Sequence, residues 1–160
     1  MSAMKTLIFV LFCGMFLFPV GCAPTIEVRL GTMARADIPP VEIHFVGCDD
    51  LDKKSAEAAD ISQYWSFIAR KVPVGEDVAI VRLGGNAGSS AKVDERYWWL
   101  WKNNGAKYIV GISNWPVPRD ALPERFADPR IIVIPMKDLE GKKATITVGD
   151  TLTALPVHIE

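Results

Sequence analysis

The sequence predicts a mainly β protein, a β-sandwich of about seven short strands with two short helices inserted between them. Apolar segments of strand length recur along the chain after residue 24, and turn-forming pairs such as Pro-Pro, Gly-Gly and Asn-Gly separate them. Only two segments carry apolar residues at helical spacing. No internal repeat or low-complexity tract interrupts this pattern, so we expect one domain.

The first two predicted strands, residues 25–30 and 41–46, alternate between apolar and polar residues. Their apolar faces carry Ile26, Val28 and Leu30 in the first strand and Val41, Ile43 and Phe45 in the second. His44 falls on the polar face of the second strand together with Glu42. We therefore expect His44 to be a solvated histidine rather than a metal ligand or a general base.

A polar stretch follows the second strand and leads to the first predicted helix. Asp49, Asp50 and Asp52 lie close together in it but lack the glycine and the distal glutamate of a calcium loop, so we expect solvated loop acids. Residues 60–63 then form a capping-box arrangement. Four apolar or aromatic residues follow at helical spacing: Ile61, Tyr64, Trp65 and Ile68. This helix must end before Pro73, because proline lacks an amide donor.

The second predicted helix covers residues 95–104, with Asp94 as its cap and Gly105 as its end. Tyr97, Leu100 and Trp101 fall on one side of it. Trp99 points to the opposite side, so we expect it to lie outside the core.

The later strands are predicted from apolar and β-branched segments at residues 77–83, 106–113, 130–134, 144–148 and 151–155. The last two are expected to form a hairpin with a type II′ turn at Gly149-Asp150. Residues 84–92 are glycine-rich but lack the lysine of a phosphate-binding loop at the required spacing, so we expect a flexible loop. A proline-rich loop over residues 114–129 is expected to carry Trp115 across the surface.

The composition argues against several classes of function. The formal net charge is -1 with scattered charges, so no nucleic-acid partner is expected. The histidines His44 and His158 are far apart and belong to no spaced ligand motif, so we expect no metal and no cofactor. No Gly-x-Ser-x-Gly motif is present, and we expect the protein not to be an enzyme. Cys48 is expected to be a partly buried thiol at a strand end.

The tryptophans supply the candidate contact residues. All five lie after residue 22, and most are expected to fill the core. Trp99 and Trp115 are the exceptions, and we predict that they contact a partner or a ligand, because exposed aromatic side chains anchor protein interfaces and stack on sugars. The alternatives are an envelope protein partner, a groove for a glycan or another small ligand, and incidental packing of two loop aromatics.

The beginning of the chain predicts where the protein is located in the cell. One lysine, Lys5, precedes an apolar run from Leu7 to Val20, which is shorter than the about 20 residues that a membrane-spanning helix needs. The run ends on Pro19-Val-Gly-Cys22, which resembles a bacterial lipobox, with Pro19 where that family usually has Leu. The resemblance implies a signal peptide over residues 1–21, a mature periplasmic domain over residues 22–160, and lipid (diacylglycerol and a further acyl chain such as palmitate) on Cys22. Ala23 stands where the family's inner-membrane retention signal has Asp, which implies an anchor in the outer membrane, facing the periplasm.

Several segments resemble uncharacterised bacterial outer-membrane lipoproteins, among them residues 59–65, 94–105 and 127–132. A second resemblance is to the TssJ-type lipoprotein of type VI secretion systems, through the lipobox cysteine, Pro40-Val-Glu-Ile-His-Phe45, the Ala-Asp helix start at residue 59 and Tyr108-Ile-Val-Gly-Ile112. That family is a β-sandwich with an added helix that docks a larger membrane subunit. We therefore expect a membrane-anchored, non-catalytic binding or scaffold domain for another envelope component. The alternatives are a TssJ-like assembly subunit and a glycan-binding or small-ligand-binding module.

Overall fold

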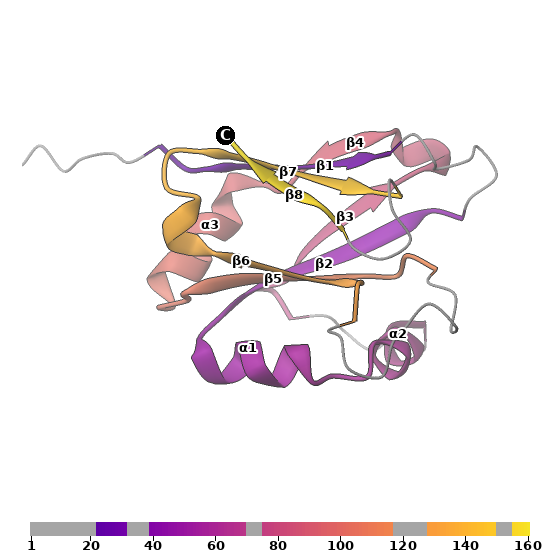
Figure 1. The fold of residues 1–160 in the computed structure, drawn as a ribbon, viewed down its shortest axis with the longest axis horizontal. Helices are drawn as coiled ribbons and strands as arrows, with labels where there is room; N and C mark the ends of the chain where they lie inside the picture. The colour runs from indigo at the N-terminus through magenta and orange to yellow at the C-terminus, as the bar shows by residue number, and fades with distance from the viewer. Residues whose placement is uncertain (1–21, 32–38, 70–74, 117–127, 150–154) are drawn as a thin grey trace, which may run out of the picture.

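A computed structural model describes residues 22–31, 39–69, 75–116, 128–149 and 155–160. Within these residues eight strands form two four-stranded sheets, of order β4-β1-β7-β8 and β3-β2-β5-β6. The sheets lie face to face with the main core between them (Figure 1). The strands are β1 (Thr25–Leu30), β2 (Val41–Cys48), β3 (Ala79–Leu83), β4 (Ser90–Lys92), β5 (Tyr108–Ser113), β6 (Ile131–Pro135), β7 (Lys143–Val148) and β8 (Val157–Ile159). The predicted β-sandwich is confirmed. The predicted signal peptide lies outside the described residues.

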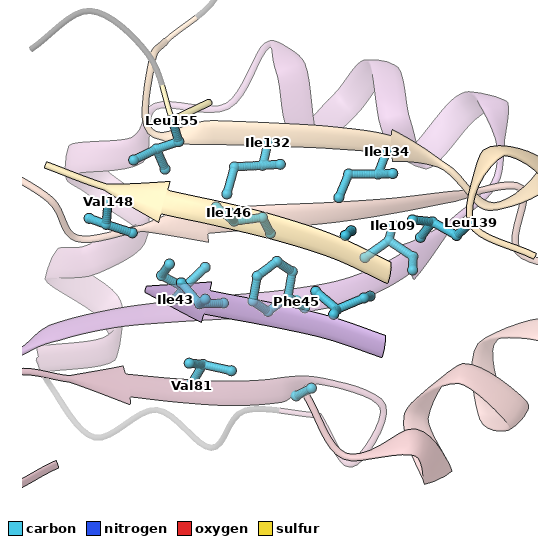
Figure 2. Close-up of a cluster of buried hydrophobic side chains, with 14 of the residues drawn as sticks. Ile43, Phe45, Val81, Ile109, Ile132, Ile134, Leu139, Ile146, Val148 and Leu155 are labelled. Carbon is cyan, nitrogen blue, oxygen red and sulfur yellow. The ribbon is translucent and has the colours of Figure 1, made fainter. Parts of the chain in front are cut away.

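The core is built by the alternation that the sequence shows. The apolar face of β2, with Ile43 and Phe45, points toward the other sheet, where Ile146 and Val148 of β7 meet it (Figure 2). Phe45 and Ile43 are fully buried, as the pattern predicts. Gly111 on β5 makes room for the Phe45 ring, because a Cβ at this position would lie 2.7 Å from a ring carbon.

The first sheet is mixed. β1 pairs in parallel with β7, from Thr25 opposite Lys143 to Leu30 opposite Val148, and antiparallel with the short strand β4. The flexible loop predicted over residues 84–92 is therefore wrong for β4, because pairing with β1 orders three residues that carry no apolar alternation.

The predicted hairpin at the end of the chain is also wrong in its register. β7 pairs with Val157–Ile159, with Ile146 opposite Val157, and not with residues 151–155. Part of the predicted partner strand, residues 151–154, lies outside the described residues. The connection between the two strands is thus longer than the two-residue turn that Gly149 indicated.

Three α-helices lie within the described residues: α1 (Asp50–Glu57), α2 (Ile61–Ala69) and α3 (Glu95–Asn103). The sequence predicted α2 and α3 but not α1. Asp49 caps α1, since its carboxylate accepts hydrogen bonds from the amides of Leu51 and Asp52 at 2.8 and 2.9 Å. The acids expected in a loop are therefore the start of a helix. Its only apolar residues, Leu51 and Ala56, are too few to form the apolar stripe by which a helix is predicted.

α1 and α2 lie on the outer face of the second sheet (Figure 1). A second apolar cluster fills the space beneath them, centred on Cys48, Ile61, Val110 and Ile112. Two 3-10 turns complete the described structure, η1 (Gly85–Ala87) and η3 (Met136–Asp138). Among the described residues no helix is long and apolar enough to cross a membrane.

Candidate functional site

One end of the sandwich gathers most of the features that distinguish this chain. Helix α3, the connection from β6 through η3 to β7, and the start of β1 lie together at this end, on the left in Figure 1. The Thr25 amide donates to the Lys142 carbonyl at 3.1 Å, and the Met136 amide donates to the Lys107 carbonyl at 2.8 Å. Lys102 of α3 pairs with Glu140 at 3.0 Å. We call this region the α3 end.

The cysteine expected to carry lipid is attached to the α3 end. Cys22 is exposed and lies three residues before β1. Ala23 packs against the core, and Pro24 is buried. The chain is therefore fixed to the sandwich almost up to Cys22.

Helix α3 presents one tryptophan to the outside. Trp98 and Trp101 are buried, and the Trp101 indole donates to the Asp77 carbonyl at 2.7 Å. Trp99 is 39% exposed, which confirms the expected position outside the core. Leu100, expected on the inner side, is 37% exposed because the helix turns Trp98 toward the core in its place.

Trp115 does not lie on the surface as expected. It is 7% exposed and belongs to the main core, and its indole Nε1 has no hydrogen-bond partner within the described residues. The Trp115 amide donates to the Ser113 hydroxyl at 3.0 Å, a local turn that places the ring inward. Contact with a partner or ligand by Trp115 would require the ring to leave the core.

A pocket of about 390 Å³ opens beside α3. Trp98, Ala106, Tyr108, Pro135 and Met136 form its apolar lining, and Lys102, Lys107, Lys137 and Glu140 its polar lining. Lys102 also lies over the Trp98 ring, 5.8 Å from its centre. These residues come from separate segments of the chain, so no spacing in the sequence could indicate the pocket. Its lysines and aromatic rings suit an anionic group attached to an apolar body.

His44 stands at the centre of a buried polar cluster on the other side of the second sheet. It is 2% exposed, so the expected solvation is wrong: helix α2 covers the polar face of β2. The His44 Nδ1 atom lies 2.6 Å from the Tyr64 hydroxyl, and Nε2 lies 2.6 Å from the Glu42 carboxylate. Trp65 packs against the imidazole ring with 4.8 Å between ring centres.

The hydrogen-bond roles in this cluster follow from the ionisation of Glu42. Burial opposes ionisation of Glu42, but hydrogen bonds from His44 and from Arg82, at 2.5 Å, hold its pKa below the ordinary value. An ionised carboxylate only accepts, so we assign the Nε2 proton to the bond with Glu42. Burial, with the charge of Glu42, raises the pKa of Tyr64, which therefore keeps its proton and donates it to Nδ1. The hydrogen bond from Tyr64 to Nδ1 joins α2 to the sheet, and the charge-assisted bond to Glu42 fixes the imidazole that accepts it.

Cys48 is a thiol at the end of β2, as the sequence predicts, and it is more fully buried than expected. It is 5% exposed, and burial, together with the nearby charges of Asp52, Asp49 and Asp77, raises its pKa to about 11. Its thiol is thus protonated at neutral pH. Within the described ranges no group of three or more His, Cys, Asp or Glu side chains is arranged to hold a metal ion.

These features define a class, a small β-sandwich domain in which a helix covers one end and presents exposed aromatic and lysine side chains. No protein-family model matches the chain, and no curated protein matches it. A chain in the solved structure described as the T6SS protein TssM C-terminal domain (869–1107) from EAEC is similar to it, with a TM-score of 0.51 and 17% identity over 84% of this chain and 99% of that chain.

Two further solved structures are similar over most of the chain. Lip of Serratia marcescens, a membrane-bound component of the type VI secretion system, has a TM-score of 0.46 and 14% identity over 84% of this chain and 97% of that chain. The T6SS lipoprotein TssJ1 from Pseudomonas aeruginosa has a TM-score of 0.45 and 11% identity over 85% of this chain and 94% of that chain. At 17% identity the similarity to the EAEC structure shows a shared fold and no more.

Proposed function

We propose that this protein is a lipid-anchored scaffold domain of the bacterial envelope, which binds a larger envelope protein and performs no catalysis. In this proposal Cys22 carries the lipid, and residues 22–160 face the periplasm from the outer membrane. The observation that carries the proposal is the combination of a lipobox ending on Cys22 with a β-sandwich that begins only three residues later. Several acyl chains on one cysteine would hold the domain on the membrane for very long times.

The sequence suggests a first partner to test. Residues 40–45 and 108–112 resemble the TssJ-type lipoprotein, a family that docks a larger membrane subunit. A TssJ-like role in assembling a type VI secretion system is the specific form of the proposal, and the larger membrane subunit of such a system is the partner it predicts. The similarity to the chain in the EAEC structure supports the shared fold alone.

A ligand-binding module is the competing function, and the position of Trp99 favours the scaffold function over it. A glycan or small-ligand groove would have its exposed aromatic side chain in the groove lining. Three pockets formed by the described residues touch α3, next to Trp98, Leu100 and Trp101, and Trp99 lines none of these three. An exposed aromatic side chain outside a pocket is typical of a contact with a larger surface.

A cross-linking pull-down from the native envelope tests the scaffold function. The lipidated wild-type protein is expected to recover one large membrane protein, and Cys22→Ala, which removes the anchor, is expected to recover much less of it because the effective concentration at the membrane is lost. Mass spectrometry of the peptide that begins at residue 22 tests the lipid in the same sample. If the lipidated wild-type protein recovers no specific protein, the scaffold function is contradicted. The protein should then be tested for binding to cell-wall fragments.

A further inference from the structure

We propose that the α3 end is a membrane-contact surface, which lies on the phospholipid headgroups to which Cys22 is anchored, with Trp99 at the interface and Lys137 and Lys142 on lipid phosphates. This inference rests on the proposed anchor and adds the orientation of the domain and the residues that touch lipid.

The first argument is the length of chain between the anchor and the sandwich. Only Ala23 and Pro24 separate Cys22 from Thr25, and the three Cα–Cα steps between them span about 10 Å even when the chain is fully extended. The Thr25 amide is hydrogen-bonded to Lys142, so this short link starts at a fixed point of the α3 end. Acyl chains on Cys22 can enter a bilayer only if this end of the sandwich is within that distance of the headgroups.

The second argument is the exposed face of α3. Trp98 and Trp101 bury the inner side of the helix, whereas Trp99 and Leu100 are 39% and 37% exposed. A tryptophan combines a large apolar ring with an N–H donor, which makes it the side chain that favours the boundary between acyl chains and headgroups. In the orientation that the anchor sets, Trp99 and Leu100 would contact the bilayer interface.

The third argument is the distribution of the lysines. Lys137 lines the pocket beside α3, and Lys142 adjoins the start of β1. Both are exposed, and neither forms an ion pair within the described part of the chain. Lys102 and Lys107 are paired with Glu140 and Asp50, so they contribute less net charge. The two unpaired ammonium groups beside the anchor complement the phosphates of an anionic leaflet.

The test uses the lipidated full-length protein reconstituted into vesicles of phosphatidylethanolamine and phosphatidylglycerol at about 3:1, with detergent micelles as the reference. Phospholipids brominated on the acyl chain quench tryptophans at the interface. We expect quenching of the wild type to be lost in Trp99→Phe, because Trp98, Trp101 and Trp115 are buried in the protein and Trp65 is half-buried on α2, with its ring against His44.

Lysine labelling provides the second measurement. Reductive methylation in vesicles, relative to micelles, is expected to slow by about fivefold at Lys137 and Lys142 and to be unchanged at Lys54, which is exposed on α1. The variant Lys137→Glu should lower the quenching of Trp99. The matched control, Lys54→Glu, changes the net charge equally and should leave the quenching unchanged.

The outcomes separate this inference from the proposed function. A chain without lipid on Cys22 overturns the anchor and this inference with it. A lipidated chain with uniform lysine reactivity, or with quenching that Trp99→Phe does not reduce, overturns the orientation alone. Protection of Trp99, Lys137 and Lys142 in native envelopes but not in vesicles would mean that the α3 end contacts a protein, and would also overturn it.

Discussion

The contact between β2 and α3 gives the sharpest test of the fold, and the substitution is Gly47→Ala. A methyl group at position 47 would lie 2.5 Å from Cγ and 2.6 Å from Cβ of Trp101, where ordinary van der Waals contact begins at 3.4 Å. These Trp101 atoms are close to the helix backbone and cannot swing aside. Trp101 is 1% exposed, so α3 must move or the core must open.

We expect Gly47→Ala to destabilise the protein by about 1–3 kcal/mol, the usual cost of overpacking a filled core. For a domain of this size that corresponds to a fall in Tm of about 3–15 °C. Thermal unfolding of the purified protein in detergent, followed by far-UV circular dichroism, measures it. The near-UV spectrum should change as well, because the surroundings of the Trp101 indole change.

Gly88→Ala is the control for this experiment. Position 88 has no atom within 4 Å of an added Cβ but has a φ of +85°, so this variant measures backbone strain without overlap. It should lower Tm and leave the near-UV tryptophan signal intact. A Gly47→Ala protein with wild-type Tm and an unchanged near-UV spectrum would refute the packing of α3 against β2.

Three further predictions concern the buried groups. Tyr64→Phe removes the donor to His44 Nδ1 and should lower the free energy of unfolding by about 1–3 kcal/mol in urea titrations, and a wild-type midpoint would contradict the assigned hydrogen bond. Glu42 has a folded-state pKa below its ordinary 4.5, so its contribution to stability is present above pH 4.5 and is lost as the pH falls through the lower, folded pKa. Glu42→Gln should therefore be less stable than the wild type at pH 7. Below about pH 4.5 its free energy of unfolding should fall less steeply with pH than that of the wild type. Cys48, with a pKa of about 11, should react with iodoacetamide at pH 8 about 100-fold more slowly than in urea, and equal rates in the two conditions would contradict its burial.

The sequence predicts the parts of this fold in which burial repeats with a fixed period. The alternation in β2 correctly places Ile43 and Phe45 in the core, because each strand of a sandwich has one face toward the other sheet. The same reasoning does not predict helix α1, because α1 buries no residue and its start is fixed by the Asp49 cap. A period-based prediction detects only those elements that contribute a face to the core.

The burial of His44 illustrates what a single strand cannot report. Its position on the polar face of β2 was predicted correctly, but that face is covered by Tyr64 and Trp65 of α2. The sequence contained both halves of this contact as separate motifs. The path of the chain from β2 to α2 decides whether the outer face of the sheet contacts solvent or the helix. Neither the strand pattern of β2 nor the helical pattern of α2 indicates that path.

The candidate contact residues divide in the same way. Helical spacing was sufficient to place Trp99 outside the core, because a regular helix fixes the relative directions of its side chains. Trp115 lies two residues after the end of β5 and belongs to no regular element, so no period in the sequence indicates the direction of its ring. The pocket beside α3 could not be predicted at all, because its lining combines the helix with residues 106–108 and 135–140.

The short link to Cys22 also limits where a protein partner can bind. If the α3 end lies on the headgroups, a partner of ordinary interface size cannot share that end without lifting the domain, which a link of about 10 Å does not allow. The partner must then use the sides of the sandwich or the end opposite to Cys22. Substitutions at Trp99 should consequently change the orientation on the membrane and leave the recovery of the partner intact, whereas a partner lost with Trp99→Ala would place it at the α3 end and remove the bilayer from that surface.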